Sequence, residues 1–386
     1  MRILEVIADL SLKAGGPPVS VISNGAALAR LGHEVVVATT NAYGDQLDIK
    51  ARGGTAHPIH TFQVWPPQRF AFSRGLTGFL WKEIPNFDVV IIHGLYVYST
   101  MAASLICRRF NVPYIIEPHG ALDPFIYKRH RLRKSIMELT FQNRATRCAS
   151  AFWFSSEDEA ALAKPFILGS RFFVAPHAVD LAPFAACRDR KPFEEVFDRA
   201  CILFYGRVNF KKGLDLLLEA FSILRKRNLP CELVVAGPVD EEMVPRLREW
   251  ERRFDVAGQV KYLGSVTGEQ RLDVLGDASV FALPSYSENF GIAVLEAIAA
   301  GLPVVISDQV NIHDEITSAR VGLVTRCDAN EVANSLQLLI SDRRLNMEFR
   351  NNTREFVNNR YSQMANASVL EKNIEQTIRR HRALDS

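Results

Sequence analysis

The chain has 386 residues, of which 48% are hydrophobic and 23% charged, a length and composition typical of a globular protein with two domains of somewhat under about 200 residues each. The 46 basic and 43 acidic side chains leave a net charge of +3, so the bulk charge does not indicate nucleic-acid binding. The six cysteines form no Cys-x-x-Cys pair and have no histidine at metal-ligand spacing, which indicates buried thiols in a reducing compartment.

The N-terminal segment predicts a first strand, not a signal peptide. Residues 3–8 are apolar except for Glu5, and the chain turns soon afterwards into Gly15-Gly16. No segment has about 18 uninterrupted apolar residues, so we expect no membrane span and a cytoplasmic location.

The chain then continues as a βαβ unit, with a helix to Leu31 and a strand over 34–39. A dinucleotide-binding fold is the obvious rival prediction. The loop lacks Gly-x-Gly-x-x-Gly, however, and the second strand ends at Asn41 without the acid that would hold an adenosine ribose. Gly16 would still let a ligand phosphate or sugar approach the backbone closely; the alternative is that both glycines only make the turn.

The next stretch, residues 42–87, has several aromatic residues but no sustained period, and we expect a loop with a short helical piece there. A strand over 89–93, a helix over 98–109 and a strand over 114–117 follow. The last strand runs into Pro118-His119-Gly120. Parallel sheets place ligand contacts at the carboxyl ends of their strands, so His119 is a candidate site residue, although a purely structural role is equally compatible.

Residues 127–147 carry the strongest local charge bias of the chain. Apolar residues at helical intervals punctuate this segment, which predicts an interfacial helix drawn to the anionic inner-membrane surface or to a lipid-linked acceptor. The alternative is a solvated surface helix. The basic residues Lys128, Arg129, Arg131, Arg133, Lys134, Arg144 and Arg147 stand against a single acid, Glu138.

Strands over 151–155 and 172–175 complete the first sheet, and an irregular passage between Pro176 and Pro192 predicts a domain boundary. The same alternation then repeats, which favours α/β architecture with two doubly wound domains. We place the first domain at 1–180, the second at 181–365 and a helix returning to the first domain at 366–386. The second domain is expected to have strands over 201–205, 232–236, 260–263, 279–283, 303–306 and 322–325, and helices over 214–227, 241–254, 268–276, 290–300 and 329–340.

Two carboxylates flank the junction between the strand 279–283 and the helix 290–300. Glu288 falls just outside the helix, with Ser287 or Asn289 as candidate caps, and Glu296 falls about two turns inside it. An anion between them would face the unpaired N–H groups and the positive end of the helix dipole. A sugar nucleotide, with hydroxyls at one end and a ribose at the other, has this pattern of groups.

Two cations follow the first strand of the second domain, Arg207 in Gly206-Arg207 and Lys212 in Lys212-Gly213. The carboxyl ends of parallel strands share one edge, so both cations are expected on the same rim as Glu288. Structural salt bridges would explain either cation alone. Both together, opposite a helix N-terminus, indicate a bound diphosphate.

In these motifs the sequence resembles the retaining glycosyltransferases of the GT-B fold, in the bacterial group 1 (family 4) that includes exopolysaccharide and lipopolysaccharide mannosyl- and glucosyltransferases. The resemblance covers nearly the whole chain. It departs at Pro176-His177-Ala178-Val179-Asp180, where many relatives have Pro-Asn-Gly-Val-Asp. The matching residues are Gly15-Gly16, Pro118-His119-Gly120, Gly206-Arg207, Lys212-Gly213, Gly237-Pro238, Leu263-Gly264, Pro284-Ser285, and Glu288 with Glu296.

The resemblance implies two Rossmann-like domains facing across a cleft, with a C-terminal helix strapped back to the first domain. It implies a GDP-sugar or UDP-sugar donor whose diphosphate is held by Arg207 and Lys212. It further implies that Glu288 contacts the donor sugar, Glu296 the ribose, and His119 lies beside the reacting carbon. Main-chain groups at Asn289, Phe290 and Gly291, near Gly16, at Pro238 and at Val266 would complete the donor site.

The chain has no Asp-x-Asp motif suited to a donor metal, so we expect metal-independent transfer without a cofactor, in which cations and a helix N-terminus stabilise the leaving diphosphate. The expected acceptor is a saccharide or lipid-linked oligosaccharide, and the expected place is the cytoplasm or the cytoplasmic face of the inner membrane. Two alternatives remain open: a nucleotide-sugar protein of another activity, such as a 2-epimerase or a phosphorylase, and a non-catalytic membrane-associated binding protein.

Overall fold

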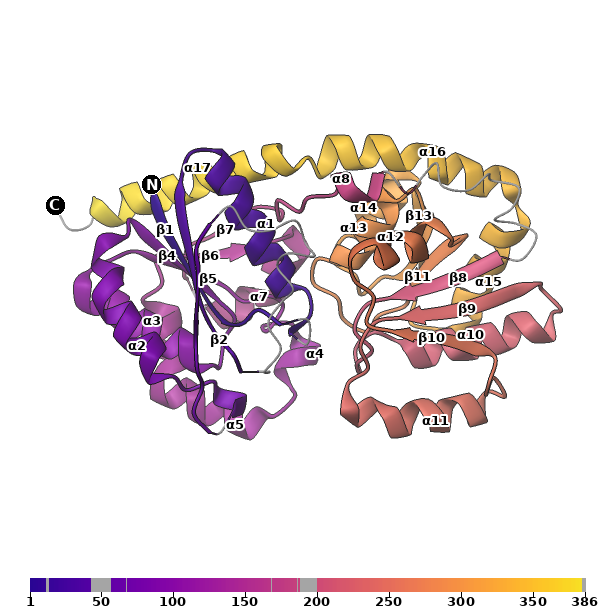
Figure 1. Ribbon diagram of the computed structural model, residues 1–386, viewed down its shortest axis with the longest axis horizontal. Coiled ribbons are helices and arrows are strands. Elements are labelled where there is room, and N and C mark those ends of the chain that lie inside the picture. Colours follow the sequence, from indigo (N-terminus) through magenta and orange to yellow (C-terminus); the bar gives the residue numbers. More distant parts are fainter. Residues whose placement is uncertain are drawn as a thin grey trace. The chain divides into compact units, whose positions relative to one another are not determined.

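The computed structural model describes residues 1–11, 14–42, 57–66, 68–167, 169–185, 187 and 200–383. The chain divides into two compact units (Figure 1). Unit 1 comprises Met1–Val179 together with Gln363–Ser386, and unit 2 comprises Asp180–Ser362. Both are α/β units with a parallel sheet, as the alternation of strand and helix patterns predicts.

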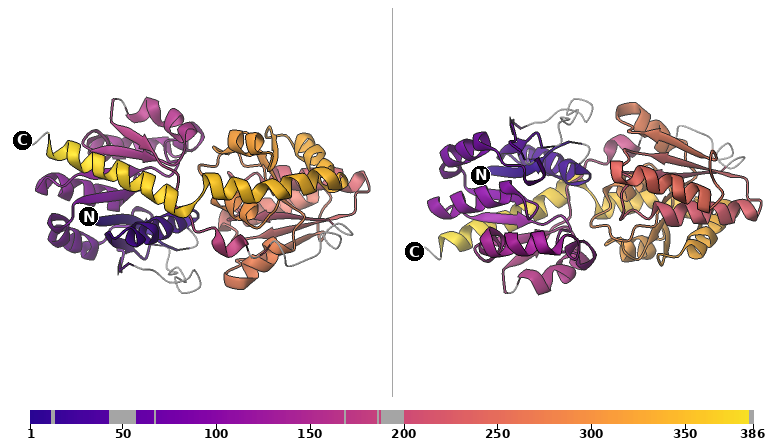
Figure 2. Two further views of the ribbon diagram at one scale, coloured as in Figure 1. Left: turned by 90° about the horizontal axis from the view of Figure 1, so that it is seen from above. Right: turned by 90° about the horizontal axis from the view of Figure 1, so that it is seen from below.

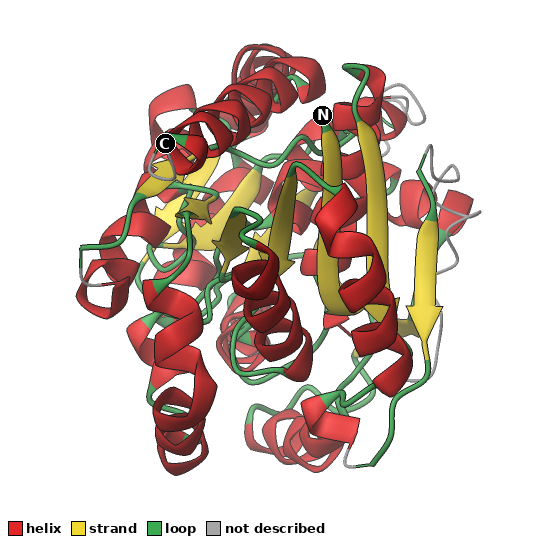
Figure 3. Cartoon of the chain, turned by 90° about the vertical axis from the view of Figure 1, so that its left-hand side faces the viewer, coloured by secondary structure: helices red, strands yellow, loops and turns green. Residues whose placement is uncertain are grey.

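The sheet of unit 1 has seven described strands in the order β3-β2-β1-β4-β5-β6-β7. Every neighbouring pair is parallel. The inner strands read as nearly continuous apolar runs because helices cover both of their faces (Figure 3). The bounds are β1 Arg2–Asp9, β2 Glu34–Thr40, β3 Ile59–Phe62, β4 Val89–His93, β5 Tyr114–Glu117, β6 Ala151–Phe154 and β7 Phe172–Val174.

The two faces of this sheet pack in different hydrophobic clusters. On one face, α2 (Arg74–Glu83), α3 (Tyr98–Phe110) and α7 (Glu157–Ile167) pack against residues such as Leu4 and Val6. On the other face, α1 (Pro17–Arg30) and α17 (Gln363–Arg382) pack against residues such as Ile3 and Trp153. The alternation of side chains along a strand sends neighbouring residues to opposite layers.

Helix α17 confirms the expected return of the C-terminal helix to the first domain. Its residues Leu370, Ile374 and Ile378 are buried in the cluster that contains Ile3 and Trp153. Figure 2 shows α17 lying lengthwise along unit 1. It follows α16 (Arg343–Arg360), which belongs to unit 2.

The stretch between residues 42 and 87 is more regular than expected. The sequence predicts a loop and a short helical piece, whereas the structure has strand β3, helix α2 and two short 3₁₀ turns at Gln68–Phe70 and Ile84–Asn86. Strand β3 has only four residues and sits at the edge of the sheet, with its central residues exposed, so it lacks an apolar run that periodicity could detect. Residues 43–56 and 67 lie outside the described part of the chain.

The basic segment is divided into several short helices, whereas the sequence predicts a single helix. It consists of α4 (Pro124–Tyr127), α5 (Arg131–Met137), a π-helical turn at Glu138–Gln142 and α6 (Asn143–Arg147). The break before α5 falls at His130, whose φ is 54°. A left-handed residue ends one helix and starts the next at a new angle.

The sheet of unit 2 has the order β10-β9-β8-β11-β12-β13, and its neighbouring strands are again parallel. All six predicted strands are present within a residue or two, because five of them are short, mostly buried and largely apolar runs, while the sixth, at the edge of the sheet, is partly exposed. Their bounds are β8 Ala200–Tyr205, β9 Cys231–Ala236, β10 Val260–Gly264, β11 Val280–Leu283, β12 Val304–Ser307 and β13 Gly322–Thr325.

The helices of unit 2 match the prediction except in three places. The predicted helix near residue 290 starts later, α14 (His313–Ala319) between β12 and β13 is not predicted, and α8 (Ala182–Ala185) lies in the passage that is predicted to be irregular. The predicted helix over 290–300 is α13, which begins at Ile292 and ends at Ala299. The others are α10 Leu214–Lys226, the 3₁₀ turn Glu241–Met243, α11 Val244–Arg253, α12 Gly268–Gly276 and α15 Ala329–Ser341. In the described ranges, no helix is both long enough and apolar enough to span a membrane.

Candidate active site

In unit 2, the loops that follow β8 and β11 are fastened to each other by the backbone. The N–H of Tyr286 donates to the carbonyl of Lys211 over 2.7 Å. Gly213, with φ 66°, caps α10, and a Cβ at this position would lie 1.9 Å from the carbonyl oxygen of Pro284. Only glycine fits such an approach. The glycine therefore brings its neighbour Lys212 against the loop that carries Glu288.

Lys212 and Glu288 form an ion pair in which the ammonium donates a hydrogen bond to Oε2. Both side chains are only 12% exposed. Burial acts to raise the pKa of Glu288, but Lys212, Lys211 and Arg207 outweigh it and lower the pKa. The carboxylate is thus held ionised among three cations, which is the constellation that the sequence predicts for this rim.

Arg207 follows β8 directly and lies beside Asp240, with 3.8 Å between its Nε and Oδ1. The loops after β8 and β9 are joined there, because the N–H of Val208 donates to the carbonyl of Pro238 over 2.8 Å. A Cβ on Gly237 would lie 2.0 Å from the carbonyl oxygen of Gly206. The loop after β10 is joined in turn by a 2.7 Å bond from the N–H of Gly237 to Gly264, two residues before the buried Val266.

Helix α13 starts at the same edge of the sheet, with Gly291 as its N-cap at φ 66°. The prediction that Ser287 or Asn289 caps it is wrong, since no side chain caps this helix. Backbone hydrogen bonds hold the loop before α13 instead. The N–H of Glu288 donates to the carbonyl of Gln309, and the carbonyl of Glu288 accepts from the N–H of Asn311. The first N–H groups of a helix have no acceptor one turn back. In α13 the N–H of Val294 already donates to the carbonyl of Gly291 over 2.8 Å, so an anion would meet the N–H groups of the residues before Val294.

Two of the predicted donor-site residues have side chains that contact other protein groups. Phe290 is 4% exposed and packs edge-on against Tyr361, with ring centroids 5.9 Å apart, so only its backbone can serve a ligand. Glu296 is the fifth residue of α13, little more than one turn inside, and its Oε1 lies 3.6 Å from Nη1 of Arg271 on α12. Arg271 carried no motif signal in the sequence.

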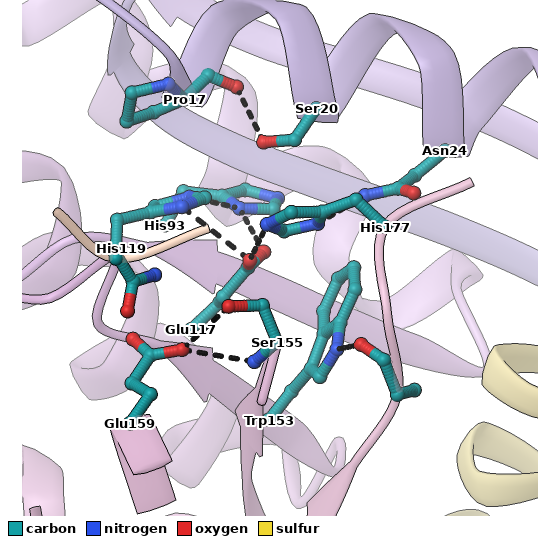
Figure 4. A network of polar contacts seen from close by, with 12 residues as sticks. Pro17, Ser20, Asn24, His93, Glu117, His119, Trp153, Ser155, Glu159 and His177 are labelled. Atoms are coloured by element: carbon teal, nitrogen blue, oxygen red, sulfur yellow. Dashed lines mark hydrogen bonds and ion pairs between the residues drawn. The ribbon is translucent and has the colours of Figure 1, made fainter. Parts of the chain in front are cut away.

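In unit 1, His119 follows β5 with φ 51° and belongs to a buried cluster with His93 and Glu117 (Figure 4). His93 Nδ1 lies 3.0 Å from Oε2 of Glu117, and His119 Nδ1 lies 3.4 Å from Oε1. The two imidazoles also meet at 3.1 Å, Nδ1 of His93 to Nε2 of His119. His93 and Glu117 are partners in the parallel register of β4 and β5. His93 ends its strand just as Glu117 does, which is the signal that would have revealed this pair.

His177 completes the cluster. Asn24 accepts the N–H of Ala178 through Oδ1 over 2.7 Å, so its amide NH₂ faces Nδ1 of His177 at 3.2 Å. Nδ1 must then accept, which leaves the ring proton on Nε2, 3.3 Å from Oε1 of Glu117. The neighbouring backbone therefore sets the tautomer of His177.

Burial controls the protonation of the cluster. It lowers the pKa of His93 to about 3, that of His119 to about 4, and that of His177 well below its ordinary value. Burial raises the pKa of Glu117 to about 8. At neutral pH the three imidazoles are uncharged, so His119 acts as a hydrogen-bonding group and not as a cation.

Glu159 on α7 fixes the loop that carries His119. Its carboxylate accepts the N–H of Gly120 over 2.9 Å and the N–H and hydroxyl of Ser155 over 2.8 and 2.9 Å. Gly16, the other predicted residue of this unit, is exposed at the N-terminus of α1. Figure 4 shows the first turn of α1, with Pro17 and Ser20, lying over the imidazoles.

One donor set in the described part of unit 1 could hold a metal. His93, Glu117 and His119 each offer a ligand atom within 4.8 Å of the other two. Two imidazoles and one carboxylate suit zinc or ferrous iron. His177 cannot join as a neutral ligand because its Nε2 carries the proton. The expectation that the chain works without a metal stays a prediction.

Two protein-family descriptions match the chain. "Glycosyl transferase 4-like domain" matches residues 15–170 and "Glycosyl transferases group 1" matches residues 188–356. Together they include every site residue that the sequence predicts, whereas His177 lies between the two matched ranges.

Among curated relatives, the gpi3 subunit of phosphatidylinositol N-acetylglucosaminyltransferase from Schizosaccharomyces pombe is 25% identical over 322 residues, 82% of this chain and 67% of that protein. The phosphatidyl-myo-inositol mannosyltransferase of Mycolicibacterium smegmatis is 28% identical over 340 residues, 86% of this chain and 82% of that protein. Among solved structures, Anabaena HepE in complex with UDP and glucose has a TM-score of 0.77 at 17% identity, covering 97% of this chain and 99% of that one. The structural likeness concerns the fold.

Proposed function

Because this chain belongs to the group 1 glycosyltransferases of the GT-B fold, we propose that it transfers a hexose from a UDP-sugar or GDP-sugar to a saccharide acceptor with retention of the anomeric configuration. The names of the relatives, a mannosyltransferase and an N-acetylglucosaminyltransferase, support a nucleotide-sugar donor. The structural neighbour bound to UDP and glucose supports it as well.

The observation that carries the proposal is the cluster of charges at the rim of unit 2. Arg207 and Lys212 flank the ionised Glu288, beside the uncapped first turn of α13. A diphosphate supplies the negative charge that the two cations and the helix N-terminus favour. Glu288 then accepts hydrogen bonds from donor hydroxyls, while Glu296, held by Arg271, is proposed to meet the ribose.

The proposed reaction breaks the bond between the anomeric carbon and the diphosphate oxygen. Arg207, Lys212 and the N–H groups at Asn289, Phe290 and Gly291 stabilise the charge that develops on the leaving diphosphate. The acceptor oxygen forms the new bond from the same face of the sugar, and its proton passes to the departing phosphate. Because the cations of the chain supply this charge stabilisation, the proposed transfer is metal-independent.

His119 is proposed to orient the donor sugar. Its imidazole is uncharged at neutral pH because burial lowers its pKa to about 4. Its Nδ1 faces Glu117 at 3.4 Å and its Nε2 faces His93 at 3.1 Å, so a hydroxyl of the donor sugar is proposed to replace one of these two contacts when it binds. It is not placed in the role of nucleophile.

The proposed acceptor is lipid-linked, in the biosynthesis of a surface polysaccharide, and the basic segment is proposed to bind the anionic membrane surface. Its apolar residues Leu132, Ile136 and Leu139 are 80%, 56% and 85% exposed and recur at helical spacing. The acid of the segment, Glu138, accepts hydrogen bonds from Tyr96 and Tyr127 and pairs with one of the basic residues, Arg131, at 3.2 Å. Exposed apolar side chains among arginines are typical of interfacial segments.

A thermal-shift screen of UDP- and GDP-sugars, with and without EDTA, tests the donor site. We expect one nucleotide sugar to stabilise the protein equally in both conditions, and an anomer assignment by NMR of the transferred product to show retention. A nucleotide sugar converted to its epimer without an acceptor would instead assign the chain to the epimerase class. Dependence of turnover on a restored divalent metal would contradict metal-independent transfer.

A further inference from the structure

A cavity of about 510 Å³ opens in unit 1 between the C-terminal half of α17 and the segments that lead into β6 and β7. It lies at the amino ends of these strands, whereas His119 follows the carboxyl end of β5. In a parallel sheet these are opposite edges. The cavity is therefore separate from the candidate active site of this unit.

The charged groups that line the cavity have one sign. Arg147, Arg171 and Arg380 contribute guanidinium groups, and none of the described lining residues is acidic. Two arginines of α17 that do not line the cavity have acidic partners. Arg379 pairs with Glu375 at 3.2 Å, and Arg382 pairs with Asp88 at 2.9 Å. In the described ranges, the three lining guanidinium groups have no ion-pair partner.

The wall of the cavity is fixed by α17. Nδ1 of His381 meets the hydroxyl of Ser150 at 3.3 Å, and Nε2 meets the carbonyl of Asn111 at 3.3 Å. These contacts tie the end of the helix to the strand edge, and they hold the neighbouring Arg380 at the rim. Phe172, 40% exposed, gives the same cavity an apolar wall.

A structural role accounts for part of this charge. Arg147 and Arg380 lie in the last turns of α6 and α17, where cations stabilise the helix dipole. Arg171 lies in no helix and precedes β7, so the dipole does not explain its position. Three arginines around one concave surface match the geometry with which guanidinium groups bind phosphate oxygens.

We propose that this cavity binds a phosphate group carried by an organic molecule, outside the donor site. The phosphate could belong to a free phosphorylated metabolite or to the headgroup of an anionic lipid. Three arginines would meet the phosphate oxygens, and Phe172 would contact the attached apolar or sugar portion. This proposal does not depend on the proposed transferase activity.

The test compares two double variants of the full chain, each lacking two positive charges. Arg171→Gln with Arg380→Gln removes cavity arginines. Arg379→Gln with Arg109→Gln removes exposed arginines that do not line it. Both also carry Lys212→Met, so that the proposed donor site contributes less to anion binding. Circular dichroism without ligand checks that both fold.

Inorganic pyrophosphate, followed by the shift in Tm, probes the free phosphate, and phosphatidylcholine vesicles with and without phosphatidylglycerol probe the lipid. We expect the cavity variant to bind one of these probes at least about tenfold more weakly than the control variant, as the loss of charged hydrogen bonds predicts. A difference with pyrophosphate identifies a soluble phosphate ligand, and a difference confined to phosphatidylglycerol vesicles identifies a lipid headgroup. Equal affinities of both variants for both probes would overturn the proposal.

Discussion

Gly213 determines where Lys212 lies, although it has no side chain of its own. Its φ of 66° disfavours other residues, and the 1.9 Å approach of a hypothetical Cβ to the carbonyl oxygen of Pro284 excludes them. The glycine that follows Lys212 therefore has a packing cause beside the chemistry proposed for the lysine.

Substitution of Gly213 by alanine separates backbone strain from steric overlap. Gly264 has the same φ of 66°, but nothing lies within 4 Å of a Cβ built there. We expect Gly264→Ala to lower the free energy of unfolding by about 1 kcal/mol, the cost of the left-handed conformation. Gly213→Ala should cost about 3 kcal/mol or more, measured by urea denaturation. Equal losses would show that the close approach to Pro284 is absent.

Glu117 predicts a pH dependence of stability. Burial raises its pKa from 4.5 to about 8. Between these values the folded chain keeps a proton that the unfolded chain releases, so the free energy of unfolding falls as pH rises through this window. Above about pH 8 the contribution of this proton to stability is lost.

Glu117→Gln keeps the shape of the side chain and removes the titration. Urea unfolding between pH 6.5, the ordinary pKa of histidine, and pH 8 should show a slope shallower in the variant, by up to about 1.4 kcal/mol per pH unit. Burial raises the pKa of Glu5 in both proteins, and the smaller contribution that Glu117 makes to that pKa is lost in the variant. Parallel slopes would show that Glu117 is ionised throughout.

At this scale the sequence predicts residues that stand in motifs and misses those that only packing brings together. Lys212 and Glu288 are 76 positions apart, yet the common strand edge predicts their meeting. Arg271 beside Glu296, and Glu117 among three histidines, depend on which helix face and which strand register the fold selects. A single sequence carries no direct signal of those choices.

Helix α17 contributes to the core of a unit from which it is far apart in the sequence. Its apolar residues complete the core of unit 1, although more than 180 residues of unit 2 separate it from the rest of that unit. The sequence predicts a polar helix in the C-terminal region. Its buried residues Leu370, Ile374 and Ile378, at helical spacing, determine what the helix packs against.

Truncation of one of these positions tests the packing. Ile374 is fully buried, whereas Val369 on the same helix is 43% exposed. We expect Ile374→Ala to lower the free energy of unfolding of unit 1 by about 3 kcal/mol, and Val369→Ala to change it by less than about 0.5 kcal/mol. Hydrogen exchange in β1 and β6 measures the effect in unit 1 specifically. Similar protection in both variants would contradict the packing of α17.

The basic segment makes a prediction at the same scale. Leu139→Asp, at an 85% exposed position, should reduce co-sedimentation with phosphatidylglycerol-containing vesicles at least about tenfold, because burial of that side chain in lipid is lost. Leu338→Asp is the control, since Leu338 is 45% exposed on α15 of unit 2. Equal sedimentation of the two variants, or binding insensitive to salt, would remove the membrane from the proposed function.

Helix α13 shows why the boundaries of helices and strands are harder to predict than their order along the chain. An Ala- and Leu-rich run predicts a helix from residue 290, but Gly291 in the left-handed region delays its start to Ile292. The two glutamates keep their places on either side of this start. The loop in between is shaped by its backbone bonds to Gln309 and Asn311, which no local pattern announces.

For the whole molecule, the alternation of short apolar runs and helical patterns predicts both units and six of the seven described strands of unit 1. The sequence does not predict strand β3, because this short edge strand has no apolar run. The division at Val179 and Asp180, and the return of the chain to unit 1 at Gln363, follow from which residues share a core. The donor sugar and the acceptor are chosen by side chains whose identities the fold class does not fix.

The central claim is that Lys212, with Arg207 and Glu288, holds the diphosphate of a nucleotide-sugar donor. The most direct measurement compares the rate of sugar transfer by Lys212→Met with that of Lys226→Met, a lysine exposed at the end of α10. We expect Lys226→Met to keep wild-type turnover and Lys212→Met to lose at least about a hundredfold, the usual cost of removing one group that stabilises developing charge. Near-normal turnover of a folded Lys212→Met protein would contradict the account.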